Sequence, residues 1–132
     1  MPCYSSKLLD HFRHPRNAGA LEDADGVGEV ANPQSGDTTR LAIRVADAIV
    51  QDIRWQTRGC SGSIAASSAA SELVKGKPLA AALDLTHREI ALALGGLPPA
   101  KAHCAILAVE AVRAAVADYQ KRVGPAASPQ HS

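Results

Sequence analysis

The chain has 132 residues, a formal net charge of +1 at pH 7 and only 3% aromatic residues. Its length suits one domain with a buried core, and its near-neutral charge and few aromatics argue against a nucleic-acid-binding protein. No apolar run reaches the roughly 18 residues of a membrane-spanning helix, and the N-terminus has no secretory signal pattern. The three cysteines lack the spacing of a disulfide framework, so we expect a cytoplasmic protein with reduced thiols.

A short helix is expected first. Ser5 or Ser6 can cap it, and Pro15 ends it at His14. Its apolar stripe comprises Leu8, Leu9 and Phe12. We expect His11 and His14 to be exposed to solvent, because the sequence pairs neither of them with another ligand.

Alternating apolar and polar residues then predict a small antiparallel sheet. A loop over residues 17–27 leads to a short strand from Val27 to Ala31. Two longer alternating runs follow. The buried face is expected to carry Leu41, Ile43 and Val45 from the first run and Ile49, Ile53 and Trp55 from the second. A three-residue connection, Ala46 to Ala48, separates the runs and predicts a hairpin.

After Cys60 the apolar pattern changes from the period of a strand to that of a helix. Ser61 or Ser63 can cap this helix. Its residues from Ile64 to Val74 are rich in alanine and serine, whose small side chains allow a neighbouring element to approach closely. Gly76 marks its C-terminal end.

Two further helices are expected in the last third of the chain. Thr86 to Glu89 match a capping box ahead of one helix, and another runs from about Lys101 to Lys121. The inward stripe of the last helix comprises Ile106, Val109, Val112, Val116 and Tyr119. This order predicts an α+β fold in which helices cover one face of a three-stranded antiparallel sheet. We expect one domain over residues 1–123 and a disordered tail over residues 124–132.

Four side chains that can bind metal fall at the ends of these elements. Asp37 precedes a strand, Cys60 lies between a strand and a helix, and His103 and Cys104 begin the last helix. One carboxylate, one imidazole and two thiolates suit tetrahedral zinc or an iron–sulfur cluster. Because a helix start favours a thiolate, both cysteines are expected to have a lowered pKa. The pattern predicts one partly exposed metal site.

A catalytic Cys–His pair is the alternative interpretation of these residues. Neighbours on a helix point about 100° apart, so His103 is expected to be a poor base for Cys104. A pairing of His103 with Cys60 is sterically feasible. No substrate pocket or oxyanion hole can be inferred from the sequence, so hydrolysis is the weaker hypothesis. Taken singly, Cys60 is equally compatible with a buried structural role, and an aspartate such as Asp37 is most often a turn or cap residue.

Short motifs lie along the chain from Tyr4 to about Tyr119. They are Asp10-His11, His14-Pro15-Arg16-Asn17, Asn32-Pro33, Gly36-Asp37, Gly59-Cys60, Ser67-Ser68, Val74-Lys75-Gly76-Lys77, Leu97-Pro98-Pro99-Ala100-Lys101 and His103-Cys104. As a set they resemble the IscU/NifU-type iron–sulfur cluster assembly scaffolds. The resemblance implies the α+β fold of the SufE/NifU superfamily. It also implies a non-enzymatic protein that accepts sulfur from a cysteine desulfurase, builds a [2Fe-2S] cluster and transfers it to apo iron–sulfur proteins.

The resemblance also implies roles for single residues. Asp37, Cys60, His103 and Cys104 are expected to hold zinc, iron or the cluster, and Cys104 is expected to accept sulfur as a persulfide. The segment from Leu97 to Lys101 is expected to bind a specialised chaperone and co-chaperone. The interval between Cys60 and His103 has the short IscU-like length, without the insertion of SufU-type relatives, which also lack the histidine.

Ser35 departs from the family pattern, which has a cysteine at this position. A serine hydroxyl is a hard, weak ligand for iron–sulfur chemistry. We therefore expect a more labile cluster, with Asp37 or His103 supplying the missing bond, and more cluster in Ser35→Cys. Two other hypotheses stay open: a zinc-bearing sulfur relay of SufU type, and a cluster-deficient regulatory variant. The relay type takes up sulfur at position 35, so Ser35 favours the scaffold, and Cys3 is expected to be an exposed thiol without a role.

Overall fold

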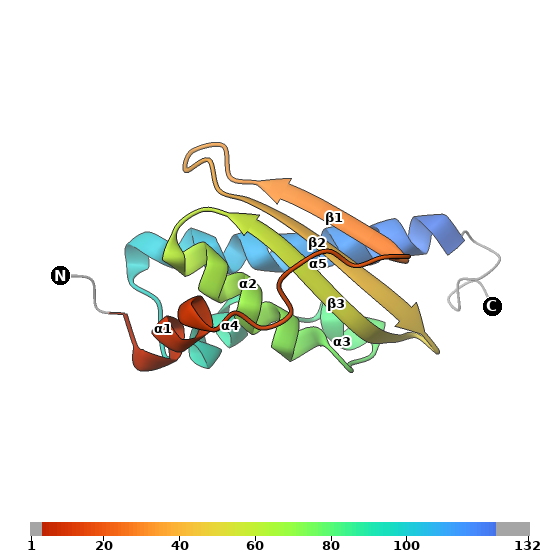
Figure 1. Cartoon of the computed structure of the whole chain (residues 1–132), viewed down its shortest axis with the longest axis horizontal. Helices are drawn as coiled ribbons and strands as arrows, with labels where there is room; N and C mark the ends of the chain where they lie inside the picture. The colour runs from red at the N-terminus through yellow and green to blue at the C-terminus, as the bar shows by residue number, and fades with distance from the viewer. Residues whose placement is uncertain (1–3, 124–132) are drawn as a thin grey trace.

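The computed structural model describes residues 4–123, so Cys3 and the predicted tail over residues 124–132 lie outside it. Its elements are α1 (Ser6–Arg13), β1 (Gly26–Ala31), β2 (Thr38–Ala46), β3 (Ile49–Arg58), α2 (Ser61–Val74), α3 (Leu79–Leu83), α4 (His87–Ala93), the 3-10 helix η1 (Pro99–Lys101) and α5 (Ala102–Val123). The strands form one antiparallel sheet in the order β1-β2-β3. Helix α5 packs along β1 and β2, and α2 packs on β3 (Figure 1). The predicted fold class is confirmed.

The core lies between the sheet and the helices. Leu41 and Ile43 of β2 lie opposite Trp55 and Ile53 of β3 in the register, and all four side chains are buried. These are core positions that the alternating pattern predicted. On the helix side, α2 buries the small residues Ala65, Ala66, Ala69 and Ala70. Small side chains on this face let the helix lie close to the sheet.

Strand β1 lies close to α5 because two of its inward positions are glycine. A Cβ at Gly28 would lie 2.5 Å from the backbone nitrogen of Ala115 and 2.7 Å from the carbonyl oxygen of Ala111. A Cβ at Gly26 would lie 2.3 Å from the carbonyl oxygen of Ala115. The strand and the helix backbone are therefore in direct contact, which holds the long helix along the sheet (Figure 1).

The hairpin between β2 and β3 is tighter than predicted. Only Asp47 and Ala48 form the turn, with φ angles of 56° and 60°. Two successive residues with positive φ match the right-handed twist of the flanking strands. The register shifts between Arg44 and Val45, so that Val50 is buried and Ile49, the predicted core residue, is only half-buried. An irregularity of this kind breaks the period-two pattern on which the prediction rested.

Two large apolar residues that were expected inside are exposed. Phe12 is 39% exposed and Ile106 is 43% exposed. In α1 the buried residues are Leu8 and His11, and Phe12 lies at the edge of the face that they form. In α5 the inward face is filled largely by alanines at positions 105, 108, 111 and 115, so the stripe is rotated away from Ile106. Although α5 has 22 residues, no helix within residues 4–123 combines the length and apolar character needed to cross a membrane.

The prediction that His11 is exposed is also wrong, whereas His14 is exposed as expected. The His11 ring is buried where α1 packs on α2, with Nδ1 2.8 Å from the Ser68 hydroxyl. Its Nε2 lies 3.6 Å from a carboxylate oxygen of Glu72. Burial, and then the nearby charge of Arg16, lower the pKa of His11. The histidine is therefore a structural contact between two helices.

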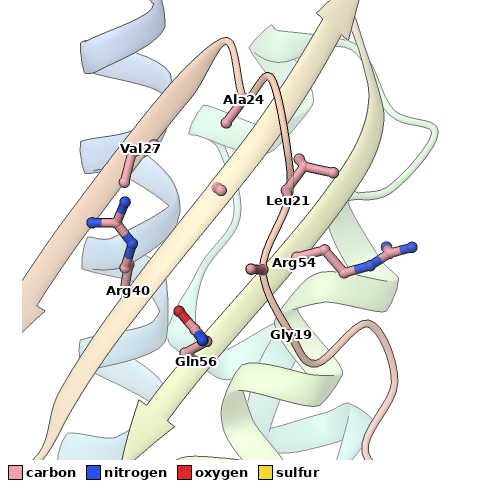
Figure 2. Close-up of a pocket in the computed structure, with 9 residues that line it drawn as sticks. Gly19, Leu21, Ala24, Val27, Arg40, Arg54 and Gln56 are labelled. Atoms are coloured by element: carbon pink, nitrogen blue, oxygen red, sulfur yellow. The ribbon is translucent and has the colours of Figure 1, made fainter.

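The outer face of the sheet carries a small cavity that the candidate ligands do not line. Its volume is about 120 Å³, and its walls are Gly19, Ala20, Leu21, Ala24, Val27, Arg40, Ala42, Arg54 and Gln56. Figure 2 shows Leu21 and Gly19 on the segment that crosses this face, with Arg40 and Arg54 on the strands beneath. The two arginine side chains extend in different directions (Figure 2), so they do not converge on a common ligand.

Candidate metal centre

Three connections meet at one end of the sheet: the β1–β2 loop, the β3–α2 junction and the start of α5 (Figure 1). They bring the four predicted ligands together. Cys60 Sγ lies 3.7 Å from Cys104 Sγ and 3.9 Å from Asp37 Oδ2. His103 Nε2 lies 3.5 Å from Asp37 Oδ2 and 3.6 Å from Cys104 Sγ. The predicted proximity of the four side chains is confirmed, while their role as ligands stays a prediction.

These distances suit a single metal ion. Bond lengths of zinc to sulfur, nitrogen and oxygen place the donor atoms of a tetrahedral site about 3.3–3.8 Å apart. The donor atoms of Asp37, His103 and Cys104 lie within 4.8 Å of one another, and Cys60 is close to two of them. Cys60 falls outside this group of mutually close donors, so its side chain would have to move for all four donors to bind one ion.

Asp37 is held in place by the loop before β2. The residue is only 6% exposed, and its carbonyl oxygen accepts a hydrogen bond of 2.8 Å from the amide of Asn32. Across the site, a Cβ at Gly59 would lie 2.7 Å from Asp37 Cγ. Glycine at position 59 therefore gives the carboxylate room beside the β3–α2 junction, next to Cys60.

Cys60 occupies the N-cap position of α2, where Ser61 or Ser63 was expected. It forms no cap hydrogen bond through its side chain. Burial raises the pKa of the Cys60 thiol, but the Ser63 hydroxyl and the nearby amides of Ser63 and Gly62 outweigh this effect, and the net pKa is below its ordinary value. The prediction of a lowered pKa is correct for Cys60.

The same prediction is wrong for Cys104. This residue is only 1% exposed, and burial raises the pKa of its thiol to about 11. Removing a thiolate from water costs more free energy than the favourable interaction with the helix N-terminus contributes. In the metal-free fold Cys104 is therefore a buried thiol rather than a thiolate. Gly62 lets it approach α2, since a Cβ there would lie 3.2 Å from Cys104 Sγ.

Ser35 lies beside the site but takes part in its own loop. Its side chain is exposed, and its hydroxyl oxygen accepts a hydrogen bond of 3.2 Å from the amide of Asp37. Its own amide donates to the side chain of Asn32 at 3.3 Å. Ser35 thus stabilises the loop that presents Asp37.

Ser63 is a site residue that the sequence analysis treated only as a possible cap. Its hydroxyl donates a hydrogen bond to Asp37 Oδ2, and its Oγ lies 3.4 Å from Cys104 Sγ. The signal in the sequence was its spacing of three residues from Cys60, which places both on one face of a helix.

The segment from Leu97 to Lys101 leads directly into the site. Pro99 and Ala100 are exposed, while Leu97, Pro98 and Lys101 are half-buried. The negative charge of the Cys60 thiolate, followed by Tyr4, raises the pKa of Lys101. A protein that binds this segment would therefore also lie close to the metal ligands.

The geometry bears on the catalytic alternative in two ways. Despite their neighbouring positions, His103 Nε2 reaches to 3.6 Å from Cys104 Sγ, so the expected separation of the two groups is wrong. However, the thiol that would act as nucleophile is buried. A substrate cannot reach Cys104 in this fold, whereas Cys60, the other candidate nucleophile, is only half-buried.

This fold and this site define the class of the protein. The family described as "NifU-like N terminal domain" matches residues 3–126, and the chain belongs to this family. It is 50% identical over 121 residues to "Iron-sulfur cluster assembly scaffold protein IscU 1" of Archaeoglobus fulgidus, covering 92% of this chain and 79% of that protein. It is 45% identical over 123 residues to the IscU scaffold protein of Escherichia coli K12, covering 90% of this chain and 95% of that protein.

Solved structures share the fold. A NifU-like N-terminal protein from Brucella abortus superposes with a TM-score of 0.72 at 20% identity, covering 89% of this chain and 94% of that one. A SufU-type protein from Fervidobacterium islandicum superposes with a TM-score of 0.73 at 19% identity, covering 86% of this chain and 96% of that one. At these identities the likeness concerns the fold alone.

Proposed function

We propose that this protein is a scaffold on which an iron–sulfur cluster is assembled and from which it is transferred. The observation that carries the proposal is the group Asp37, Cys60, His103 and Cys104, with neighbouring donors 3.5–3.9 Å apart. This group lies in a chain that is 45–50% identical to IscU scaffold proteins. The cluster is cargo, so the protein acts by holding and releasing it rather than by turnover as an enzyme.

The two thiols and the half-exposed His103 suit a [2Fe-2S] cluster that must both form and leave. Thiolates match iron, whereas the harder oxygen of Asp37 is a weaker ligand for a cluster. A donor set with only two thiolates favours release over retention. A reducing compartment, which the cysteine composition predicted, keeps both thiols available.

Sulfur is proposed to come from the persulfide of a cysteine desulfurase. A thiolate of the scaffold attacks the outer sulfur, the S–S bond of the donor breaks, and the donor cysteine leaves as a thiolate. Cys104 is the proposed acceptor. Because Cys104 is buried with a pKa of about 11, the desulfurase has to open the site and so give this thiol access to the persulfide and to a base. Mass mapping after incubation with a desulfurase should place the added sulfur on Cys104, and sulfur mainly on Cys60 would refute the assignment.

The partners proposed for the other steps bind near the same end of the molecule. The segment from Leu97 to Lys101 is proposed to bind the chaperone and co-chaperone, because it is accessible at Pro99 and Ala100 and touches the site through Lys101. Apo iron–sulfur proteins would receive the cluster at the end of the sheet where the ligands lie.

A zinc-bearing sulfur relay is the second candidate function. The spacing of the donor atoms favours it, because that spacing matches one tetrahedral zinc ion. We expect the purified protein to hold about one zinc ion per chain, in keeping with this spacing. Both functions use the same ligands, so zinc content by itself does not separate them.

Anaerobic reconstitution separates the two functions. The protein is incubated with ferrous iron, cysteine and a cysteine desulfurase, and the visible spectrum and transfer to an apo-ferredoxin are followed. The scaffold predicts cluster absorption that passes to the ferredoxin, and Cys60→Ser should abolish it. Zinc-loaded protein that passes persulfide onward without ever forming a cluster would instead establish the relay. A chain that binds zinc but neither forms a cluster nor passes sulfur would be the regulatory variant.

A further inference from the structure

The Ser63 hydroxyl contacts three of the four predicted ligands of the candidate metal site. The residue is only 2% exposed. Its Oγ donates to Asp37 Oδ2 and lies 3.4 Å from Cys104 Sγ and 3.6 Å from Cys60 Sγ. Within residues 4–123, no other hydroxyl is in hydrogen-bonding contact with both thiols. A single buried group therefore links three of the four predicted ligands.

A rigid element presents this hydroxyl. Ser63 lies in the first turn of α2, and its carbonyl oxygen accepts a hydrogen bond of 2.9 Å from the Ser67 hydroxyl. The Ser67 hydroxyl is in turn 2.7 Å from that of Thr57 on β3. This chain of contacts ties the turn that carries Ser63 to the sheet. Ser35, the other hydroxyl near Asp37, lies instead in an exposed loop.

We propose that Ser63 is the positioning residue of the metal centre. Its O–H holds the Asp37 carboxylate toward the two thiols, and its oxygen lies within 3.6 Å of both sulfurs, where a cysteine side chain would offer a third thiolate. The proposal rests on the proposed function, in which these groups bind metal. Groups that hydrogen-bond to metal ligands fix the orientation of those ligands, and their loss lowers metal affinity by about 10–100-fold.

Removal of the hydroxyl tests the positioning role. In Ser63→Ala, the dissociation constant for zinc, measured by competition with a chromophoric chelator, is expected to rise by about 10–100-fold. Ser61→Ala is the matched control, because Ser61 lies in the same helical turn and is half-buried. That variant should bind zinc as wild type does, and circular dichroism confirms that both variants fold. Wild-type affinity in Ser63→Ala would overturn the role.

Replacement of Ser63 by cysteine tests whether the side chain at position 63 points toward the metal. Cobalt(II) bound to Ser63→Cys should show thiolate-to-metal charge-transfer absorption stronger by about half than in wild type, because three soft thiolates replace two. A merely structural serine would not add this absorption. A spectrum identical to that of wild type would overturn the placement. Folded wild-type protein that binds neither zinc nor cobalt would instead refute the metal site of the proposed function, and with it the role of Ser63.

Discussion

Cys60 and Cys104 face each other across 3.7 Å but lie in different surroundings. Cys60 is half-buried at the start of α2, with its pKa lowered by Ser63 and the first-turn amides against the opposing effect of burial. Cys104 is almost fully buried, with a pKa of about 11. Two thiols of one site therefore differ in both access and ionisation.

Alkylation of the reduced, metal-free protein should reveal this difference. A thiolate is the reacting form, so iodoacetamide should modify Cys60 near neutral pH, while burial and a pKa of about 11 keep Cys104 slow to react in the folded protein. Peptide mass mapping over a series of pH values measures both rates. In denaturant the two rates should converge. Equal rates for the two cysteines in the folded protein would contradict the structure.

The exposed side chain of Ser35 has a predicted consequence for cluster loading. Ser35→Cys adds a soft ligand two residues before Asp37, in the loop that presents Asp37. We expect more cluster on anaerobic reconstitution and slower loss to a chelator, both followed by visible absorption. Ser35→Ala, which removes the hydroxyl without adding a ligand, should show no gain. If Ser35→Cys loads and loses cluster as wild type does, position 35 takes no part in ligation.

At the scale of the elements, the position of the site depends on how α5 lies on β1. Helix α5 carries His103 and Cys104 in its first turn, while Asp37 follows β1 in the chain. The contact between the two elements involves backbone at Gly26 and Gly28. A displacement of the helix would therefore separate the ligands of α5 from those of the sheet.

Gly28→Ala tests this contact. The added methyl group would overlap the backbone of Ala115 and Ala111, and overpacking of this kind lowers the free energy of unfolding by about 1–3 kcal/mol. Urea unfolding followed by circular dichroism measures the change. Glu29→Ala, at the next and exposed position of the same strand, should leave the urea midpoint close to that of wild type. An unchanged midpoint in Gly28→Ala would show that the contact is looser than described.

At the scale of the whole molecule, the metal site lies at one end of the core, and Cys104 belongs to both. One continuous cluster of buried residues joins the sheet to α1, α2, α4 and α5. The four ligands lie together where three connections meet at one end of the sheet (Figure 1). We therefore expect the fold to persist without metal, and metal to add to its stability.

Zinc should raise the free energy of unfolding by mass action. At a free zinc concentration of about 100 times the dissociation constant, the gain is expected to be about 2.7 kcal/mol. Urea unfolding with and without zinc measures it, and a chelator should reverse it. Asp37→Ala should lose most of the response. Magnesium, which prefers sites made of oxygen ligands, should have no effect. Stabilisation of Asp37→Ala equal to that of wild type would place the ion elsewhere.

The elements and most of the site were determined by the sequence itself. The alternation of apolar and polar residues around Leu41 and Ile43 and the capping box at Thr86 involve residues that are close together in the chain. Such patterns can be recognised in the sequence without knowledge of distant contacts. The ligands could be proposed because chemistry limits which side chains bind metal, and Asp37, Cys60, His103 and Cys104 all fall at element ends.

Burial and ionisation were decided by the tertiary structure. His11 is buried because α2 covers it, and Phe12 lies beside the buried pair Leu8 and His11 at the edge of that face. Ile106 is exposed because alanines fill much of the inward face of α5. The pKa of Cys104 is raised because distant segments exclude water from it, whereas its place in the sequence predicted the opposite. Ser63 joined the site only when β3, α2 and the loop before β2 were brought together. The physical reason is common to these cases: a periodic pattern reports contacts within one element, while solvation depends on which distant element lies against it.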